Sequence, residues 1–557
     1  MASSRDADTF QRTEAMTSQD YEYPGLLAAQ ILDPEADRDP LFNPTSPLEG
    51  DVEFLQIHPT GRDSTEAFDA LIRAKHEHKL NRHHAQYIHE KEAETPTITT
   101  YNEEGTAMKK PGPHLFRGYY SLGWHLPATH GPDRFHMGRG ASRYGDLREI
   151  DIMLAPPADP HSNFIGPTHA VLRMNADGAW ILEAHGEMNI DGKDYQNGEG
   201  VFLSRPKTLV IINNMFFNFI FTITTKEQER EYIERRNEAL RAWAPEKPLP
   251  DTDVSGIPFE SDVRFPSAVF RSPYGSGSFG KVFEGFSLPD GILVVVKRQQ
   301  VKDEIDRETL DLEMKALMDL KGCMGVVTML DVRDQNGWDG IPQPGDNEVY
   351  FILEKGMPFD RLYEPFEDNK WQERAGQLYH WLAGLAEMHD RGMMHRDITP
   401  QNLLIWPINE DRDQPRAALN DFGKVCYSRD SDDVRIAAEC YLPPEIDIKR
   451  KENPYKQSLD IWMLGLACLL MWYPSVRMNR NPRRFDQYEM IMLDLELDKR
   501  SYISNFIRGM MIWPAEKRPS AAQILSSRQL RAMLAPGTLK HLEAQRLRNV
   551  SGGQNSR

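Results

Sequence analysis

Cysteine is scarce in this chain of 557 residues, with four occurrences that are widely separated. No two of them form a Cys-x-x-Cys pair, which argues against a disulfide framework and against a zinc site of the common spacing. We therefore expect reduced thiols and an intracellular protein. The four positions are Cys323, Cys426, Cys440 and Cys468.

Long apolar runs are missing as well. The run Leu209–Ile223 is interrupted by Asn213, Asn214 and Asn218, and Ile461–Trp472 is shorter than the roughly 20 residues that a membrane-spanning helix needs. Residues 1–50 contain no apolar segment of the kind found in signal peptides. No membrane association is expected.

Positive charge is in deficit, because 84 acidic residues outnumber 66 basic ones and the formal net charge is −18. Binding along a nucleic acid requires clustered Lys and Arg that neutralise phosphates. The sequence therefore predicts no direct nucleic-acid partner.

The length predicts two or three folded units, since a domain averages about 150 residues. Residues 1–50 are polar and rich in Pro, and we expect a disordered tail there because little apolar surface is available for burial. Residues 51–110 are interpreted as a polar helical segment, with a helix over Ser64–Glu92. Five histidines in it favour a solvated face over a metal site, because no carboxylate or Cys completes a tetrahedral ligand set at motif spacing. They are His76, His78, His83, His84 and His89.

Residues 111–226 consist of short runs rich in β-branched and aromatic side chains, such as Ala170–Met174, and predict an all-β sandwich. A helix is expected over Thr225–Trp243, and several prolines follow it, so residues 227–262 are interpreted as a helix and Pro-rich linker. Residues 263–534 begin with strand patterns and continue with long helical periods, and residues 535–557 are expected to be a C-terminal tail.

Glycines cluster at Gly275, Gly277 and Gly280, just ahead of Val282 and between apolar strand segments. Their missing side chains would let backbone N–H groups approach triphosphate oxygens, although a flexible turn explains these glycines equally well. Lys297 then ends an apolar strand, where a buried ammonium needs a counter-charge. Nucleotide phosphates and a glutamate on the next helix would supply one.

Two glutamates on that helix compete for the pairing with the lysine. Glu313 shares a face with Ile305 and Leu317, whereas Glu308 lies nearer the edge of this apolar stripe. The pattern favours Glu313, and an ordinary solvated acid is the alternative for either residue.

A third group of polar residues begins with His395-Arg396-Asp397 and reaches Asn402 five residues after the aspartate. Asp397 can accept or orient the proton of an attacking hydroxyl, while Asn402 offers an amide oxygen to a magnesium ion. Asp421 opens an Asp-Phe-Gly sequence farther along and would be the main metal-binding carboxylate.

Taken in order, these motifs resemble those of the eukaryotic protein kinase family, serine/threonine type, over residues 263–534. The resemblance implies a bilobal fold that uses ATP and Mg²⁺ to phosphorylate protein substrates, with adenine near Glu354 and Gly356. It also implies a structural ion pair between Glu445 and Arg518. Three further motifs extend the resemblance, Pro443-Pro-Glu445, Asp460-Ile-Trp462 and Lys517-Arg518-Pro519.

The chain departs from this family two residues after the catalytic aspartate, where serine/threonine kinases usually have Lys and this chain has Thr399. Loss of a charge at this catalytic position would lower the rate, although Lys297 and magnesium remain to stabilise the transferring phosphate. Pro400 retains the serine/threonine form of the loop, which disfavours tyrosine specificity.

The activation segment, between Asp421 and Glu445, departs as well. Val434 and Ala438 replace a commonly phosphorylated threonine and a threonine that contacts the catalytic loop in relatives. We expect a carboxylate of Asp432 or Asp433 to pair with Arg396 in place of phosphate. An active kinase and a weakly active or inactive pseudokinase scaffold both fit, and the retained lysine, magnesium ligands and catalytic aspartate favour the active enzyme.

Residues 111–226 resemble a forkhead-associated (FHA) domain, a sandwich that binds phosphothreonine peptides in its own family. Gly166 replaces the serine normally found three residues before His169, and the loop expected to carry Thr-Asn reads His185-Gly186. Arg139 is the candidate phosphate ligand, with an ordinary surface arginine as the alternative. The resemblance rests on Gly138-Arg139, Asp151–Leu154, Ile165–Val171, Trp180–Leu182 and Asp191-Gly192.

An FHA-like module ahead of a kinase implies a partner protein that docks on it. By analogy with checkpoint-type kinases, it also implies a location in the nucleus or cytoplasm. The expected fold class is therefore multidomain α+β, with an all-β FHA-like sandwich followed by a bilobal protein kinase fold.

Overall fold

The computed structural model divides the chain into two compact units. One contains the described residues up to Leu172 together with Glu183–Glu199 and Lys207–Thr222, and the other contains Arg173–Leu182, Gly200–Pro206 and the chain from Ile223 onward. The structure describes residues 53–94, 97–101, 107–111, 115–126, 128–140, 150–156, 159–247, 249–250, 252, 254–277, 280–334, 348–361, 371–406, 416–433, 435–446, 454–473, 475, 480–497, 503–534 and 536–552.

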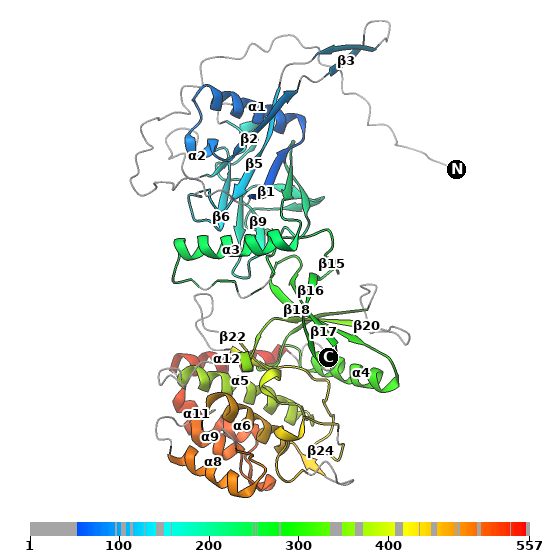
Figure 1. The fold of residues 1–557 in the computed structure, drawn as a ribbon, viewed down its shortest axis with the longest axis vertical. Coiled ribbons are helices and arrows are strands. Elements are labelled where there is room, and N and C mark those ends of the chain that lie inside the picture. Colours follow the sequence, from blue (N-terminus) through cyan, green and yellow to red (C-terminus); the bar gives the residue numbers. More distant parts are fainter. Residues whose placement is uncertain are drawn as a thin grey trace, which may run out of the picture. The chain divides into compact units, whose positions relative to one another are not determined.

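The first unit is built on a seven-stranded antiparallel sheet with the order β11-β10-β13-β14-β1-β5-β2. Helix α1 (Arg62–His76) packs on its strands β5 and β14 (Figure 1). The strands are β1 (Glu53–Pro59), β2 (Ile88–Glu94), β5 (Leu115–Gly123), β10 (Met188–Ile190), β11 (Lys193–Tyr195), β13 (Lys207–Ile212) and β14 (Met215–Phe221).

Alternating burial explains the strand conformation in the centre of this sheet. In β14 the side chains of Phe217, Phe219 and Phe221 are buried, while Phe216 is exposed. This period of two places one apolar face on the core. The expected run Leu209–Ile223 is a hairpin, because its chain reverses at Asn213, which adopts a positive φ of 52°.

The segment expected to be a polar helix is only partly helical. Helix α1 ends at His76, α2 spans only Arg82–Ala85, and the rest of the segment supplies strands β1 and β2. Pairing with β5 outweighs the polar local pattern of β2, whose sequence is Ile-His-Glu-Lys-Glu-Ala-Glu. Among the described residues no three His, Cys, Asp or Glu side chains gather as a metal site, and His83 instead contacts the buried Asp151 at 3.1 Å.

A second sheet has five strands in the order β12-β9-β8-β6-β7. Its strands lie close to the runs expected between residues 111 and 226. They are β6 (Arg134–Gly138), β7 (Ile152–Met153), β8 (Ala170–Met174), β9 (Trp180–Ala184) and β12 (Gly200–Phe202), and a separate hairpin is formed by β3 (Thr97–Tyr101) and β4 (Ala107–Pro111).

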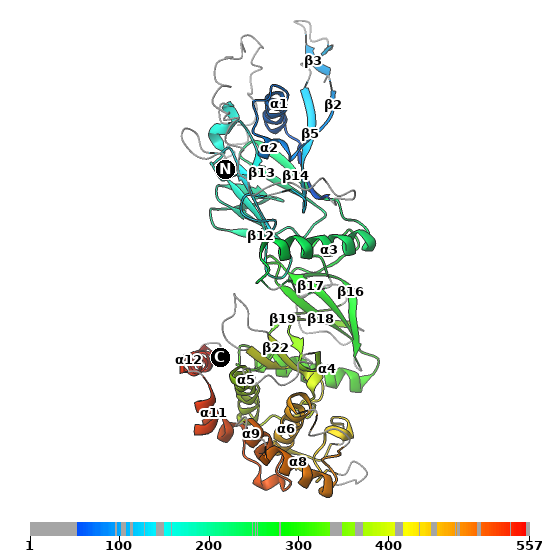
Figure 2. The ribbon, with the colours of Figure 1, turned by 60° about the vertical axis from the view of Figure 1, so that its left-hand side comes forward.

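The first helix of the second unit is α3 (Lys226–Trp243), and Thr225 and Gln228 cap its N-terminus. Its six-stranded sheet has the order β15-β16-β17-β18-β20-β19, and α4 (Glu304–Asp319) lies along it (Figure 2). The strands are β15 (Val263–Arg264), β16 (Ala268–Gly277), β17 (Gly280–Ser287), β18 (Leu293–Gln300), β19 (Met329–Asp334) and β20 (Glu348–Glu354).

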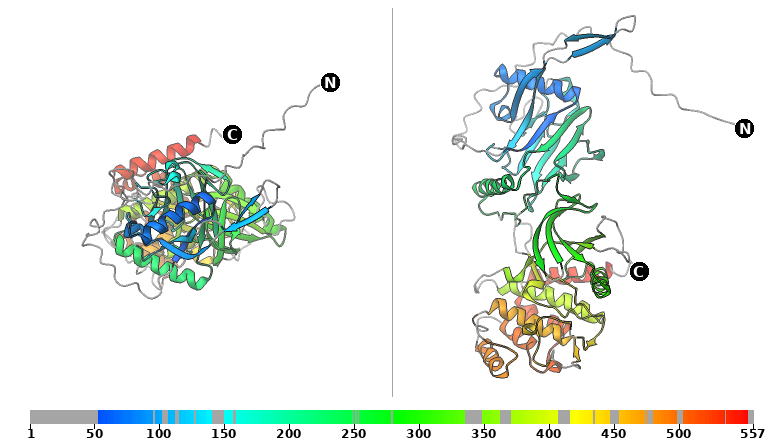
Figure 3. Two further views of the ribbon diagram at one scale, coloured as in Figure 1. Left: turned by 90° about the horizontal axis from the view of Figure 1, so that it is seen from above. Right: turned by 45° about the vertical axis from the view of Figure 1, so that its right-hand side comes forward.

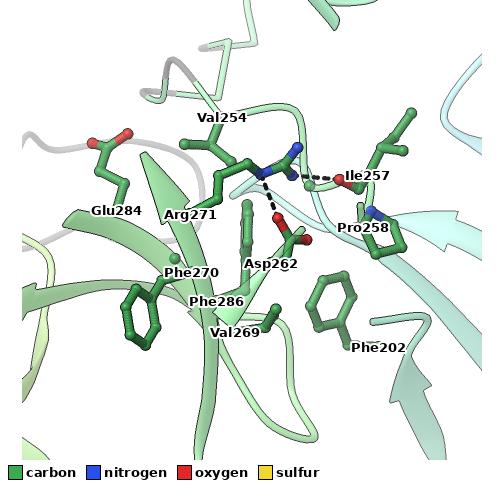
Figure 4. Close-up of a pocket in the computed structure, with 12 residues that line it drawn as sticks. Phe202, Val254, Ile257, Pro258, Asp262, Val269, Phe270, Arg271, Glu284 and Phe286 are labelled. Atoms are coloured by element: carbon green, nitrogen blue, oxygen red, sulfur yellow. Dashed lines mark hydrogen bonds and ion pairs between the residues drawn. The ribbon is translucent and has the colours of Figure 1, made fainter. Parts of the chain in front are cut away.

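The linker packs tightly on this sheet. Arg271 of β16 contacts Glu229 of α3 at 3.2 Å. It also contacts Asp262 at 3.1 Å and donates to the carbonyl of Ile257 (Figure 4). Burial raises the pKa of Asp262 against the lowering effect of Arg271. Residues 173–182 and 200–206 join the same unit, since Ile181 and Phe202 share a core cluster with residues of β16, β17 and β18.

Helices make up most of the remaining chain and enclose a large apolar core. The expected C-terminal tail contains one of them, α12, drawn in red in Figure 3. Its Leu542 is buried in the apolar core. The main helices are α5 (Trp371–Asp390), α6 (Ser458–Trp472), α8 (Phe485–Leu497), α9 (Ile503–Met510), α10 (Ala521–Ser526), α11 (Arg528–Met533) and α12 (Pro536–Gly552). None of the described helices is long and apolar enough to cross a membrane.

Short strands complete the second unit. A three-stranded sheet carries the loops that flank the candidate site, and a small two-stranded pairing lies in the activation segment. The first has the order β21 (Met357–Pro358), β22 (Leu403–Trp406) and β23 (Arg416–Leu419), and the second pairs β24 (Asp430–Ser431) with β25 (Tyr455–Lys456).

Candidate active site

Lys297 lies at the centre of a buried ionic cluster. Its Nζ is 2.8 Å from Oε1 of Glu313 and 2.8 Å from Oδ1 of Asp421, and Gln299 donates to the second oxygen of Glu313. Strand β18 presents the lysine, and Val282 of β17 stands directly opposite it in register. Three segments that are distant in sequence therefore meet at one ammonium.

Electrostatics keep this cluster ionised. Burial acts to lower the pKa of Lys297, but the carboxylates of Asp421 and Glu313 outweigh it and raise that pKa. Burial likewise opposes ionisation of Asp421, yet the ammonium of Lys297 holds the pKa of this carboxyl below its usual value. A charged lysine with fixed acids can orient phosphate oxygens.

Of the two glutamates left open by the sequence, Glu313 is the one that reaches Lys297. Glu313 is 1% exposed, while Glu308 is exposed on another face of α4. Ile305, expected on the buried stripe, is 57% exposed because the buried face of the helix begins only at Leu310.

The loop that follows α5 places Asp397 and Asn402 together. Nδ2 of Asn402 donates to the Asp397 carbonyl at 2.9 Å and lies 3.3 Å from its Oδ2. Nζ of Lys424, which directly follows the Asp-Phe-Gly sequence, is 3.2 Å from the same Oδ2. Thr399 is nearly buried, and its carbonyl accepts from the backbone N of Asn402 at 3.0 Å.

Asp460, on the apolar helix α6, positions this loop. Its carboxylate accepts from the backbone N of His395 at 2.9 Å and of Arg396 at 2.8 Å, and His389 contacts it at 3.0 Å. Burial opposes ionisation, but His389 and the backbone donors hold the pKa of Asp460 below its usual value. The role of Asp460 does not follow from its motif, although a lone acid in an apolar helix indicates a buried polar contact.

Two residues of the site have backbones in the left-handed region. Arg396 has a φ of 66°, which is uncommon for residues other than Gly, Asn or Asp, and Asp421 has a φ of 62°. Such conformations are retained where surrounding contacts enforce them. Here the contacts of Asp460 and Lys297 do so.

The expected magnesium ligands fit the ion by their chemistry. Asn402 uses its amide nitrogen on Asp397, which leaves its amide oxygen as a candidate ligand, and Asp421 supplies a carboxylate. The backbone N of Asn420 donates to the Asn402 carbonyl at 2.9 Å, so the two ligands lie on hydrogen-bonded segments. An amide and a carboxylate oxygen are the donor types that Mg²⁺ prefers.

The expected nucleotide-binding residues lie on two elements of this unit. Gly275 pairs with Val282 and Gly277 with Gly280 in the β16–β17 hairpin, whose tip at residues 278–279 lies outside the described residues. Glu354 ends β20, and its carboxylate accepts from the backbone N of Thr328 at 3.1 Å. Close to it, a side chain at Gly356 would come within 2.8 Å of the ring of Trp406, so this position requires glycine.

In the activation segment, Asp433 is the carboxylate that meets Arg396. Its Oδ2 lies 3.1 Å from Nη1 of Arg396, and Arg435 also contacts it. Burial acts to raise its pKa, but hydrogen bonds from Arg435 and Arg396 lower the pKa of Asp433 to about 2. Asp432 is exposed, and Val434 lies outside the described residues.

Farther along the activation segment, Ala438 precedes the short 3₁₀ turn Glu439–Tyr441. Glu445 and Arg518 form a bidentate ion pair, with distances of 2.6 and 2.7 Å.

In the first unit, the side chain of Arg139, the candidate phosphate ligand, is hydrogen-bonded to a backbone carbonyl. Its Nε donates to the Ile165 carbonyl at 2.7 Å. Gly166 donates its backbone N to Nδ1 of His169, whose Nε2 lies 3.0 Å from the Glu187 carbonyl. These contacts favour a loop-holding role for Arg139.

Comparison with known proteins agrees with the geometry of the second unit. Residues 270–529 match the sequence model of the family described as protein kinase domain. Calcium/calmodulin-dependent protein kinase type 1 of Caenorhabditis elegans is 30% identical over 218 residues, which cover 37% of this chain and 56% of that kinase. Calcium/calmodulin-dependent protein kinase type 1 of Caenorhabditis briggsae is also 30% identical over 218 residues, which cover 37% of this chain and 55% of that kinase.

Aurora kinase C of Mus musculus is 24% identical over 262 residues, which cover 45% of this chain and 87% of that protein. The chain spans little more than half the length of the first two relatives. Residues 270–529 are therefore a protein kinase domain.

Proposed function

We propose that this domain transfers the γ-phosphate of ATP to serine or threonine hydroxyls of protein substrates. The observation that supports this most strongly is the ammonium of Lys297, 2.8 Å from both Glu313 and Asp421. Such a cluster suits a site that binds phosphates and a metal ion, with Asp397 and Asn402 on the neighbouring loop. The similarity to these kinases supports phosphoryl transfer to a protein, and Pro400 supports serine and threonine as acceptors.

In this proposal each residue has one role. Lys297 orients the phosphate oxygens, Glu313 holds the lysine, and Asp397 positions the attacking hydroxyl and takes up its proton. Asn402 and Asp421 would hold Mg²⁺, which neutralises charge on the phosphates. Gly275, Gly277, Gly280 and Val282 would cover the nucleotide, with adenine near Glu354 and Gly356.

A pseudokinase scaffold is the second candidate. Two departures in the sequence favour it: Thr399 stands where relatives have a charged lysine, and Ala438 stands where they have a threonine hydroxyl. The intact set of Lys297, Asp397, Asn402 and Asp421 supports the active enzyme over the scaffold.

The N-terminal unit is proposed as a docking or regulatory module for a partner protein. The FHA-like order of its sequence segments supports this, and the engagement of Arg139 with Ile165 favours a partner surface other than a phosphate pocket. The four separated, free cysteines support a location inside the cell, in the nucleus or cytoplasm.

The proposed function is tested by the turnover of magnesium-ATP on dephosphorylated casein. Lys297→Met and Asp421→Asn should each reduce phosphorylation at least a hundredfold, whereas the exposed Lys302→Met should stay within twofold. Circular dichroism checks that each variant is folded. Wild-type rates in either site variant would refute the role, and a wild-type protein without turnover would select the scaffold.

A further inference from the structure

Lys424 has no role in the motifs, yet its ammonium contacts the catalytic carboxylate. Nζ of Lys424 lies 3.2 Å from Oδ2 of Asp397, and the two side chains are only 21% and 12% exposed. Ion pairs shielded from water to this extent interact more strongly than surface pairs. The acid that would receive the hydroxyl proton therefore has a dedicated cation.

The catalytic loop itself supplies no such cation. Two residues after Asp397 the chain has Thr399, which is nearly buried and carries no charge. The neutral amide of Asn402 also lies at the Asp397 carboxylate, 3.3 Å from Oδ2. Lys424 comes from a different segment and contacts the same oxygen.

The backbone of Lys424 is held in place by Arg396 of the catalytic loop. Nε of Arg396 donates to the Lys424 carbonyl at 2.6 Å, and Nη2 lies 3.4 Å from the next carbonyl, of Val425. The same guanidinium pairs with Asp433 at 3.1 Å. A continuous set of contacts thus joins Asp433 to Asp397 through Arg396 and Lys424.

We propose that Lys424 is the cation that positions Asp397 for phosphoryl transfer in this chain. It supplies the charge that related kinases have at the position of Thr399. The inference rests on the proposed kinase activity. In that reaction the hydroxyl oxygen bonds to the γ-phosphorus, and its proton passes to Asp397. The bond from phosphorus to the β–γ bridging oxygen breaks, and its electron pair leaves on ADP. Lys424 holds Asp397 toward the hydroxyl and places a positive charge beside the phosphoryl group.

The test compares variants of the full chain on dephosphorylated casein. Lys424→Met removes the charge at similar volume and should lower kcat at least tenfold while KM for ATP stays within threefold. Adding Thr399→Lys to Lys424→Met should recover at least fivefold, because the charge returns from the neighbouring position. Lys456→Met, at an exposed lysine of β25, is the matched control and should keep the wild-type rate.

Two results overturn the inference: a rate within twofold of wild type for Lys424→Met, or no recovery in a double variant whose thermal unfolding is unchanged. If the double variant fails to fold, Lys424→Arg decides, since a rate above that of Lys424→Met supports the charge and an equal rate overturns it.

A wild-type chain without turnover would refute the kinase activity itself, and nucleotide binding then decides on Lys424. In the wild-type chain, calorimetry should show tighter binding of magnesium-bound AMP-PNP than of magnesium-bound ADP. This difference in affinity should vanish in Lys424→Met. An unchanged preference overturns the role.

Discussion

Nη1 of Arg396 lies 3.1 Å from Oδ2 of Asp433, so a carboxylate of the chain itself joins the activation segment to the catalytic loop. The Tyr455 hydroxyl donates to the Asp433 carbonyl at 2.8 Å and lies 3.2 Å from the same guanidinium nitrogen. The activation segment is therefore held at Asp433 through both the backbone carbonyl and the side-chain carboxylate.

Asp433→Asn should lower phosphorylation of casein about tenfold, because the amide loses the charge that orders Arg396 and, through it, Lys424. Asp432→Asn is the matched control, since this neighbouring acid is exposed, and should stay within twofold. Initial rates of both variants decide the matter, and equal rates would show that the ion pair does not order the site.

Phosphatase treatment should leave the activity of the purified protein unchanged, because Asp433 already occupies the arginine that a phosphate would bind. The measurement is the initial rate before and after dephosphorylation, with phosphate release followed by mass spectrometry. A tenfold or larger loss would show that Ser428, Ser431 or a more distant site switches the enzyme.

Glu313→Gln should reduce kcat/KM for ATP at least tenfold, because Lys297 then loses one of its two carboxylates and turns toward Asp421. Glu308→Gln on the same helix removes an exposed acid and should be indistinguishable from wild type. The two variants carry the same chemical change, so a similar loss in both would contradict the assignment of Glu313.

Stability should fall in mild acid because of His380, which is buried in α5 with Nδ1 2.9 Å from the Gly376 carbonyl. Burial lowers its pKa to about 4. Between the unfolded pKa of about 6.5 and this value the unfolded chain binds the extra proton, so stability decreases as pH falls, by up to about 1.4 kcal/mol per unit.

Thermal unfolding at several pH values between 7 and 4.5 measures this loss. The curve should flatten in His380→Gln and keep its slope in His125→Gln, which changes an exposed histidine. Identical slopes in both variants would assign the acid sensitivity to other groups.

Phosphothreonine peptides should bind the chain no better than about millimolar, because one charged hydrogen bond contributes about 1.5–3 kcal/mol and a micromolar complex needs about 8. Arg139 is the candidate, and its Nε is already bonded to Ile165. Calorimetry with a phosphopeptide library tests this, and a micromolar complex lost in Arg139→Ala would establish a working phosphothreonine reader.

Local patterns in the sequence predicted much of the second unit. The spacing of its own motif identifies each of four residues, namely Lys297, Asp397, Asn402 and Asp421. The structure brings Lys297 and Asp421 to 2.8 Å, and Asp397 and Asn402 to 3.3 Å. The roles of these residues remain predictions that the experiments above address.

Contacts between distant segments were not predictable in the same way. Lys424 and Asp460 act on the catalytic loop from other elements, and their neighbours in sequence give no sign of the partner. Strand β2 and helix α12 were missed for a related reason, because pairing with β5 and burial of Leu542 decide their conformations. Tertiary packing outweighs local propensity at such places.

The ion pairs of Arg271 show that the segment packed on the kinase domain's sheet begins before the residues that match the family. This arginine belongs to the first long strand of the kinase domain, yet its partners Glu229 and Asp262 precede that domain's matched residues. Cutting the chain at Val263 would remove both carboxylates that contact the Arg271 guanidinium. It would also expose the side chains of Val269 and Phe286 to solvent. We therefore expect the smallest stable form of this domain to include α3, and proteolysis in the linker should destabilise the sheet that carries Lys297.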